Sequence, residues 1–75
     1  PFPVEEQVVV IFAGVNGYLD GIEVGDITRF EQTLIDEIRD KSASLLKTIR
    51  DEGAISEDTE TRLNDFLEDF VKNFV

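Results

Sequence analysis

The spacing of apolar residues restricts this chain to helices more strongly than any other feature of its sequence. In the last third, large apolar residues recur at i, i+3, i+4 and i+7 with charged residues between them. These residues are Leu63, Phe66, Leu67, Phe70, Val71 and Phe74. Ser56 is a good N-cap, and Glu57 and Asp58 follow in the first turn, where the helix dipole favours anions. The pattern predicts an amphipathic helix over about 56–74.

The middle of the chain shows the same period over a longer stretch. One stripe contains Ile27, Phe30, Leu34, Ile38, Leu45 and Ile49. Gly53 follows it and is a typical residue at the end of a helix. This pattern predicts one helix over 26–52, about 40 Å long at ~1.5 Å per residue, which would be the spine of the fold.

The first segment, Val8 to Val15, is nearly all apolar and rich in β-branched residues, so a buried strand must be considered. On a helical wheel, however, bulky residues align over several turns: Val8, Phe12, Val15, Leu19 and Ile22. A strand does not explain this period. We therefore expect a helix over 4–20 and an all-α fold, a small three-helix bundle.

Small residues gather on the opposite side of that first helix. They are Val10, Ala13, Gly14, Gly17 and Gly21. Inside a helix, Gly14 and Gly17 would each cost about 0.8–1 kcal/mol relative to alanine. The helix either tolerates them on a solvent face, or bends there, or lets another backbone approach closely. Because the other two helices can cover only the bulky stripe, the small residues are predicted to form a partner-facing packing surface.

The size and charge of the chain exclude several classes of binding partner. The chain has 75 residues, a formal net charge of −10, and no cysteine or histidine. The acidic balance argues against nucleic acid or anionic lipid, and no disulfide can reinforce the small core. An uncovered apolar face predicts that the isolated chain self-associates or is only marginally stable. The chain lacks methionine, which predicts a piece of a longer protein, and its longest apolar run, about eight residues, is too short for direct membrane insertion.

No residue pattern indicates catalysis, cofactor binding or a metal site. Without histidine or cysteine, the serine and threonine hydroxyls have no evident activating base. Paired carboxylates such as Glu68-Asp69 fall on predicted polar faces, where a solvated surface is the simpler interpretation. The glycines of 14–17 lie within an apolar helix and no lysine follows them, so they do not form a phosphate loop. We expect no enzyme activity from this chain.

Three blocks nevertheless resemble one family along almost the whole chain. They are EEQVVVIFAGVNGYLD (5–20), ITRFEQTLIDEI (27–38) and LLKTIRDEGAISEDTETRL (45–63). In this order they are similar to the C-terminal end of the alpha subunit of rotary ATP synthases. Two departures are Asn16, where a basic residue is common, and GIEVGD, which replaces a loop that often carries proline.

The resemblance implies that the chain is the terminal part of a larger helical C-terminal domain. This part of the subunit would be structural and non-catalytic, and would support rotary coupling of proton transport to ATP synthesis. It implies as partners the rest of the alpha subunit, the beta subunit and the central gamma rotor. ATP or ADP with magnesium would bind upstream of this chain, in a separate nucleotide-binding domain. The complex would lie peripherally on the cytoplasmic face of the bacterial inner membrane or in the equivalent organelle compartment. The alternative is a free-standing acidic helical module for protein interaction.

Overall fold

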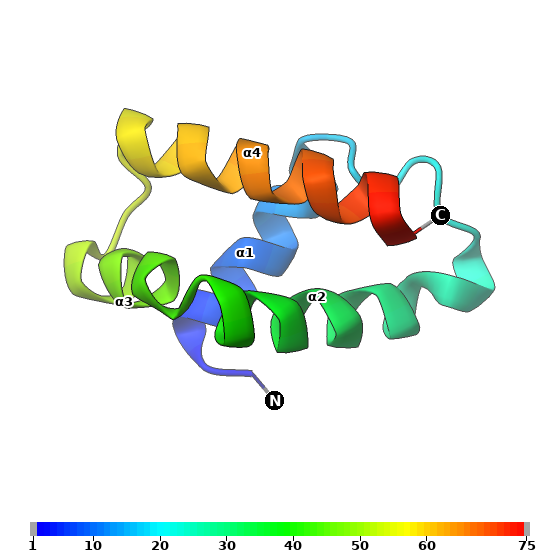
Figure 1. The fold of residues 1–75 in the computed structure, drawn as a ribbon, viewed down its shortest axis with the longest axis horizontal. Coiled ribbons are helices and arrows are strands. Elements are labelled where there is room, and N and C mark those ends of the chain that lie inside the picture. Colours follow the sequence, from blue (N-terminus) through cyan, green and yellow to red (C-terminus); the bar gives the residue numbers. More distant parts are fainter. Residues whose placement is uncertain (1, 75) are drawn as a thin grey trace.

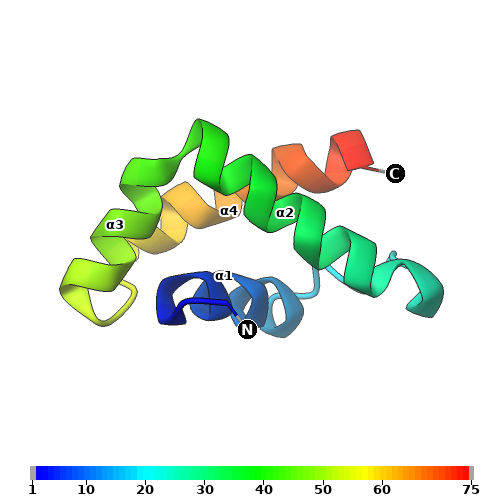
Figure 2. The same ribbon diagram turned by 90° about the horizontal axis from the view of Figure 1, so that it is seen from below.

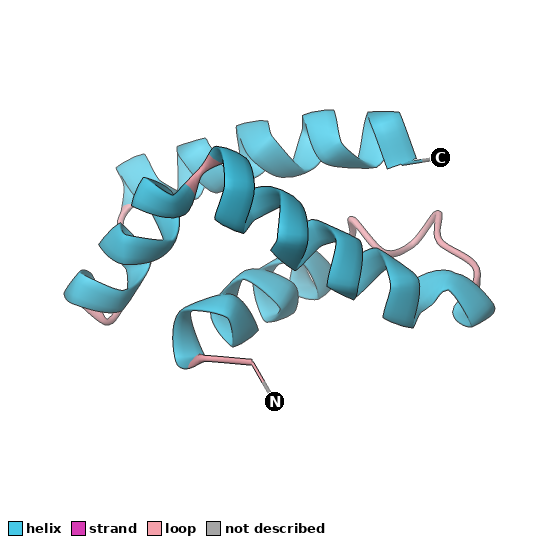
Figure 3. Ribbon diagram, turned by 60° about the horizontal axis from the view of Figure 1, so that its bottom comes forward, coloured by secondary structure: helices cyan, strands magenta, loops and turns pink. Residues whose placement is uncertain are grey.

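A computed structural model describes residues 2–74 and contains four α-helices and one short 3₁₀ helix. The elements are α1 (Val4–Val15), η1 (Val24–Asp26), α2 (Ile27–Lys41), α3 (Ala43–Glu52) and α4 (Glu57–Phe74). The described residues contain no strand, so the all-α prediction is confirmed (Figure 3). In Figure 1, α4 runs along one side, α2 and α3 along the other, and α1 crosses between them.

The core lies where the four helices meet. Its largest fully buried apolar side chains come from α2, α4 and α1: Phe30, Leu34, Ile35, Ile38, Leu63, Leu67 and Val9. Each such side chain contributes about 1.5–3 kcal/mol relative to an exposed position. Aromatic contacts extend the core toward the end of α4, where the Phe30 ring lies edge-on to the rings of Phe70 and Phe74. The α4 helix begins as predicted beside Ser56, whose Oγ accepts a hydrogen bond from the Thr59 N–H at 3.2 Å.

The predicted helix over 26–52 is wrong as a single element, because the chain breaks at Ser42. Ser42 has φ −141° and ψ 44°, outside the helical region, and its carbonyl accepts the Leu45 N–H at 2.9 Å to start α3. No large apolar residue occurs between Ile38 and Leu45. A straight helix of about 40 Å would also exceed the longest extent of the molecule, 33 Å. The bend turns α3 back toward α1 and α4 (Figure 2).

The predicted helix over 4–20 is too long, because α1 ends at Val15. Gly17 has φ 82°, a left-handed conformation that favours glycine. The Tyr18 N–H donates to the Ala13 carbonyl at 3.0 Å and the Gly17 N–H to the Gly14 carbonyl at 3.3 Å. This pair of bonds is a Schellman motif, which ends a helix. Gly17 is therefore required by the turn that ends α1, not by close packing inside a helix.

Candidate interaction surface

The buried side of α1 is narrow and differs from the predicted one. Val9 and Ala13 are 0% and 1% exposed, and Glu6 is buried beside them. Val9 and Ala13 lie roughly 120° around the helix from the bulky Val8–Ile22 line, at about 100° per residue. Ala13 was predicted to face an outside partner. This is wrong, because Ala13 belongs to the core of this chain, where its small side chain lets α1 approach its neighbours closely.

The other residues of the predicted small face do not share one surface. Val10 is partly buried against the core, whereas Gly14, Gly17 and Gly21 are exposed. A Cβ built on Gly14 would meet the Cδ1 atom of Leu19 at 3.5 Å, an ordinary contact, and one on Gly21 would meet nothing within 4 Å. Among the described residues, Gly14 and Gly21 therefore have no neighbour closer than ordinary contact distance, whereas a Cβ added to Gly17 would lie 3.3 Å from Asp20 Oδ2. Their contact with an outside partner stays a prediction.

The bulky stripe that was expected to pack inside does so only in part: Ile22 is buried in the core, Leu19 packs partly buried against it, and Val15 faces outward together with the flanking residues Val4 and Ile11. Val4, Ile11 and Val15 are 73%, 62% and 79% exposed. Val8 and Phe12 are only partly buried. The helix therefore carries a second apolar face, as the sequence indicated, but large side chains form that face.

Two adjacent hollows follow this outward face and share Val8. One lies between the start of α1 and the end of α3, against Ile49, Gly53 and Ala54. The other lies beside the second half of α1 and is closed on one side by Ile55. We define the apolar strip as the large apolar residues that line the two hollows on α1 and in the α3–α4 loop: Val4, Val8, Ile11, Phe12, Val15 and Ile55.

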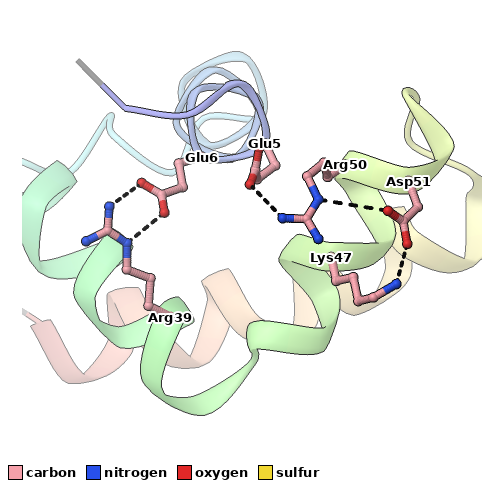
Figure 4. A network of polar contacts seen from close by, with 6 residues as sticks. All are labelled: Glu5, Glu6, Arg39, Lys47, Arg50 and Asp51. Carbon is pink, nitrogen blue, oxygen red and sulfur yellow. Dashed lines mark hydrogen bonds and ion pairs between the residues drawn. The ribbon is translucent and has the colours of Figure 1, made fainter.

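Ion pairs at the start of α1 fix which side of the helix faces the core (Figure 4). Glu6 accepts two hydrogen bonds from Arg39 of α2, each 2.6 Å long, and its side chain is only 6% exposed. This bidentate geometry is specific in orientation as well as favourable in energy. The hydrogen bonds to Glu6 raise the pKa of Arg39. Glu5, one position before Glu6 in α1, has a carboxylate oxygen 3.8 Å from the Arg50 guanidinium of α3.

The ion pair between Glu5 and Arg50 is part of a network that includes further charged residues of α3. Arg50 also lies 3.9 Å from Asp51, and Asp51 accepts a hydrogen bond from Lys47. That hydrogen bond is the main cause of a lowered pKa for Asp51. Adjacent carboxylates of α1 thus reach different helices, and α1 is held between α2 and α3 with the apolar strip outward. The sequence offered one signal of this arrangement, a carboxylate at position 6 on the same side as Val9 and Ala13.

The Tyr18 side chain connects the turn after α1 to α4. The Tyr18 hydroxyl donates to the Asn64 Oδ1 atom at 2.7 Å. Burial raises the pKa of Tyr18, and the charges of Glu68 and Asp65 raise it further. This contact holds the 16–20 turn against α4.

The potential metal-ligating side chains of residues 2–74 are all carboxylates, because the sequence has no histidine or cysteine. That part of the chain brings together no group of three or more potential metal-ligating side chains. None of its helices combines the length and the apolar character needed to cross a bilayer. The surface feature that stands out in the described residues is the apolar strip.

These features define a small helical unit with one large apolar face left uncovered by the residues that the structure describes. A family model described as ATP synthase alpha/beta chain, C terminal domain, matches residues 1–70, and the chain belongs to this family. It is 50% identical over 74 residues to ATP synthase subunit alpha of Sulfurovum sp. (strain NBC37-1). The matched region is 99% of this chain and 15% of that relative. The resemblance inferred from the three sequence blocks is confirmed.

Proposed function

We propose that this chain is a structural, non-catalytic portion of an ATP synthase alpha subunit that supports rotary coupling of proton transport to ATP synthesis. The observation that carries the proposal is the 50% identity to an alpha subunit over 99% of this chain. The match to a C-terminal domain model over residues 1–70 supports it. The chemistry of ATP would belong to a nucleotide-binding domain elsewhere in the subunit, with ATP or ADP and magnesium bound there.

In this proposal the partners are the rest of the alpha subunit, the beta subunit and the central rotor. The complex would be peripheral, on the cytoplasmic face of the bacterial inner membrane or in the equivalent organelle compartment. The exposed apolar strip fits a unit that is completed by assembly, because monomeric proteins rarely leave a large apolar patch uncovered.

A chimeric subunit tests the proposal. The matching 74 residues of the Sulfurovum alpha subunit are replaced by this chain, and the chimera is produced with the other subunits of that enzyme. We expect a complex that assembles and hydrolyses ATP, and no ATP turnover by the isolated chain. The unmodified Sulfurovum subunit is the control. A chimera that is soluble and helical but does not assemble would overturn the proposal.

A further inference from the structure

Asn16 and Gly17 combine two chemical properties at the end of α1: an exposed side-chain amide and a following residue without a side chain. An asparagine loses its amide when the next backbone nitrogen attacks its Cγ atom, and glycine hinders that nitrogen least. We propose that Asn16 is a site of spontaneous deamidation, which the turn after α1 protects while the turn is closed. Modification follows opening of the turn and prevents it from closing again.

The reaction consumes only water. The Gly17 nitrogen gives up its proton and forms a bond to Asn16 Cγ, while the Cγ–Nδ2 bond breaks and Nδ2 leaves as ammonia. The product is a five-membered cyclic imide. Water then opens the ring at one of its two carbonyls. Attack at Cγ gives an aspartate in the normal backbone, and attack at the backbone carbonyl gives an isoaspartate, whose backbone runs through Cγ. No electron donor or acceptor takes part.

The closed turn holds the reacting atoms apart. Ring closure requires the Gly17 nitrogen to eclipse Asn16 Cβ about the Cα–C bond. Asn16 has ψ 12°, whereas eclipsing needs a ψ of about −120°, because the substituents of a tetrahedral Cα are about 120° apart in projection. The Gly17 nitrogen therefore lies away from Cγ, and ψ must change by roughly 130° before the ring can close.

Hydrogen bonds engage both the leaving group and the nucleophile in this unreactive position. Asn16 Nδ2 donates to the Phe12 carbonyl at 2.9 Å, and the Gly17 N–H donates to the Gly14 carbonyl at 3.3 Å. Both bonds must break before the ring forms. Because Asn16 and Gly17 are exposed, opening this turn requires no unfolding of the core. The site is therefore slowed by the fold and still reactive.

Both products disfavour the closed turn. Each places a carboxylate at the C-terminal end of α1, where the helix dipole disfavours anions, and each removes the Nδ2 donor to Phe12. Isoaspartate also lengthens the backbone by one carbon atom before Gly17. This displaces the N–H groups of Gly17 and Tyr18 from the carbonyls that end the helix. We therefore expect a larger effect from isoaspartate than from aspartate.

The chain contains internal controls for the measurement. Its other asparagines, Asn64 and Asn73, lie in α4 and are followed by Asp65 and Phe74, whose side chains hinder the attacking nitrogen. We expect neither to deamidate at the rate of Asn16. The pair Asp20-Gly21 can form a similar imide, but its hydrolysis restores the original mass. The mass change from amide to acid therefore reports Asn16 alone.

Peptide mapping of the aged chain tests the proposal. The chain is kept in mildly alkaline buffer with and without denaturant, and mass spectrometry follows the tryptic peptide that ends at Arg29. We expect Asn16 to deamidate at least about tenfold more slowly in buffer than in denaturant. Tyr18→Phe removes the hydroxyl contact with α4 and leaves the reacting pair intact. It should raise the rate in buffer by about twofold or more and leave the rate in denaturant unchanged.

Three results would overturn the inference. An unmodified Asn16 in denaturant would show that the pair is not a reactive site. Equal rates in buffer and in denaturant, from a chain that is helical by circular dichroism, would show that the turn does not protect it. The isoaspartate form is also separated by ion exchange, and amide exchange at the end of α1 no faster than in the unmodified chain would show that the turn closes again. If the isolated chain is not helical, the chimeric alpha subunit replaces it in every measurement.

Discussion

At the scale of single residues, the orientation of α1 depends on one carboxylate. Glu6 lies on the same side of the helix as Val9 and Ala13, so burying these apolar residues also buries its charge. A buried carboxylate is unfavourable unless it is paired and hydrogen-bonded. Arg39 supplies both oxygens with partners, whereas Glu5 makes only a longer contact with Arg50.

The two adjacent carboxylates form a matched pair of tests. Glu6→Gln removes the charge that Arg39 contacts at 2.6 Å, and Glu5→Gln removes one whose partner is 3.8 Å away. We expect Glu6→Gln to lower the free energy of unfolding more than Glu5→Gln does, and to speed amide exchange of α1 in particular. Chemical denaturation and hydrogen exchange measure the two effects. Equal effects of the two substitutions would show that the Arg39 contact does not position α1.

Tyr18 gives a second test at this scale, because it is the single tyrosine of a chain without tryptophan. Absorbance at the phenolate band therefore reports Tyr18 alone. Burial, with the charges of Glu68 and Asp65, raises its pKa above the ordinary value of 10.0. We expect a midpoint above 10.0 in the folded chain and a midpoint close to 10.0 in denaturant.

The direction of the linked stability change follows from the proton count. Between pH 10.0 and the raised pKa, the folded chain keeps a proton that the unfolded chain has released. The contribution of Tyr18 to the free energy of unfolding is therefore fully present below pH 10.0. It is lost as the pH rises through the pKa of Tyr18 in the folded chain. Coincident titrations of the folded and denatured chain would contradict the contact of Tyr18 with α4.

At the scale of elements, the bounds of the helices depend on local chemistry that the apolar period does not report. The periodic residues of α4 were sufficient to predict its position, and Ser56 caps it as expected. The end of α1 was missed because Leu19 and Ile22 continue the apolar line beyond the turn made by Gly17. The break at Ser42 was missed because residues 39–44 are compatible with a helix, and only tertiary packing shows that a straight one would not fit.

Two glycines near the end of α1 distinguish a required conformation from a tolerated one. Gly17 has φ 82°, and an added Cβ would lie 3.3 Å from Asp20 Oδ2. Gly17→Ala is expected to destabilise the chain by about 1–2 kcal/mol, the penalty of the left-handed region for an L-residue. Gly21 is exposed, is not at positive φ and has no atom near an added Cβ. Gly21→Ala is the control and should be neutral or stabilising by up to about 1 kcal/mol.

Denaturant unfolding of both variants measures these effects. If Gly17→Ala were as stable as Gly21→Ala, the end of α1 at Val15 would be incorrect, and the longer helix predicted from the apolar line would be supported.

At the scale of the whole molecule, the apolar pattern of the sequence indicated that α1 has two apolar faces, but not which of them faces the core. Both sides of this helix are apolar, so periodicity alone could not choose between them. The choice depends on Arg39, which is 33 positions from Glu6 in the sequence and contacts it only in the folded chain. The family could be identified from the sequence blocks, whereas the position of the apolar strip required the packed structure.

A pair of aspartate substitutions gives the sharpest test of which side of α1 faces the core. Ile11 is 62% exposed and Ala13 is 1% exposed, on different sides of the same helix. Measured by denaturant unfolding of the dilute isolated chain, Ile11→Asp should change the free energy of unfolding by no more than about 0.5 kcal/mol. Ala13→Asp buries an unpaired charge and should reduce it by about 3 kcal/mol or more. The opposite result, with Ile11→Asp unfolding the chain and Ala13→Asp leaving it stable, would show that the large apolar residues of α1 face the core.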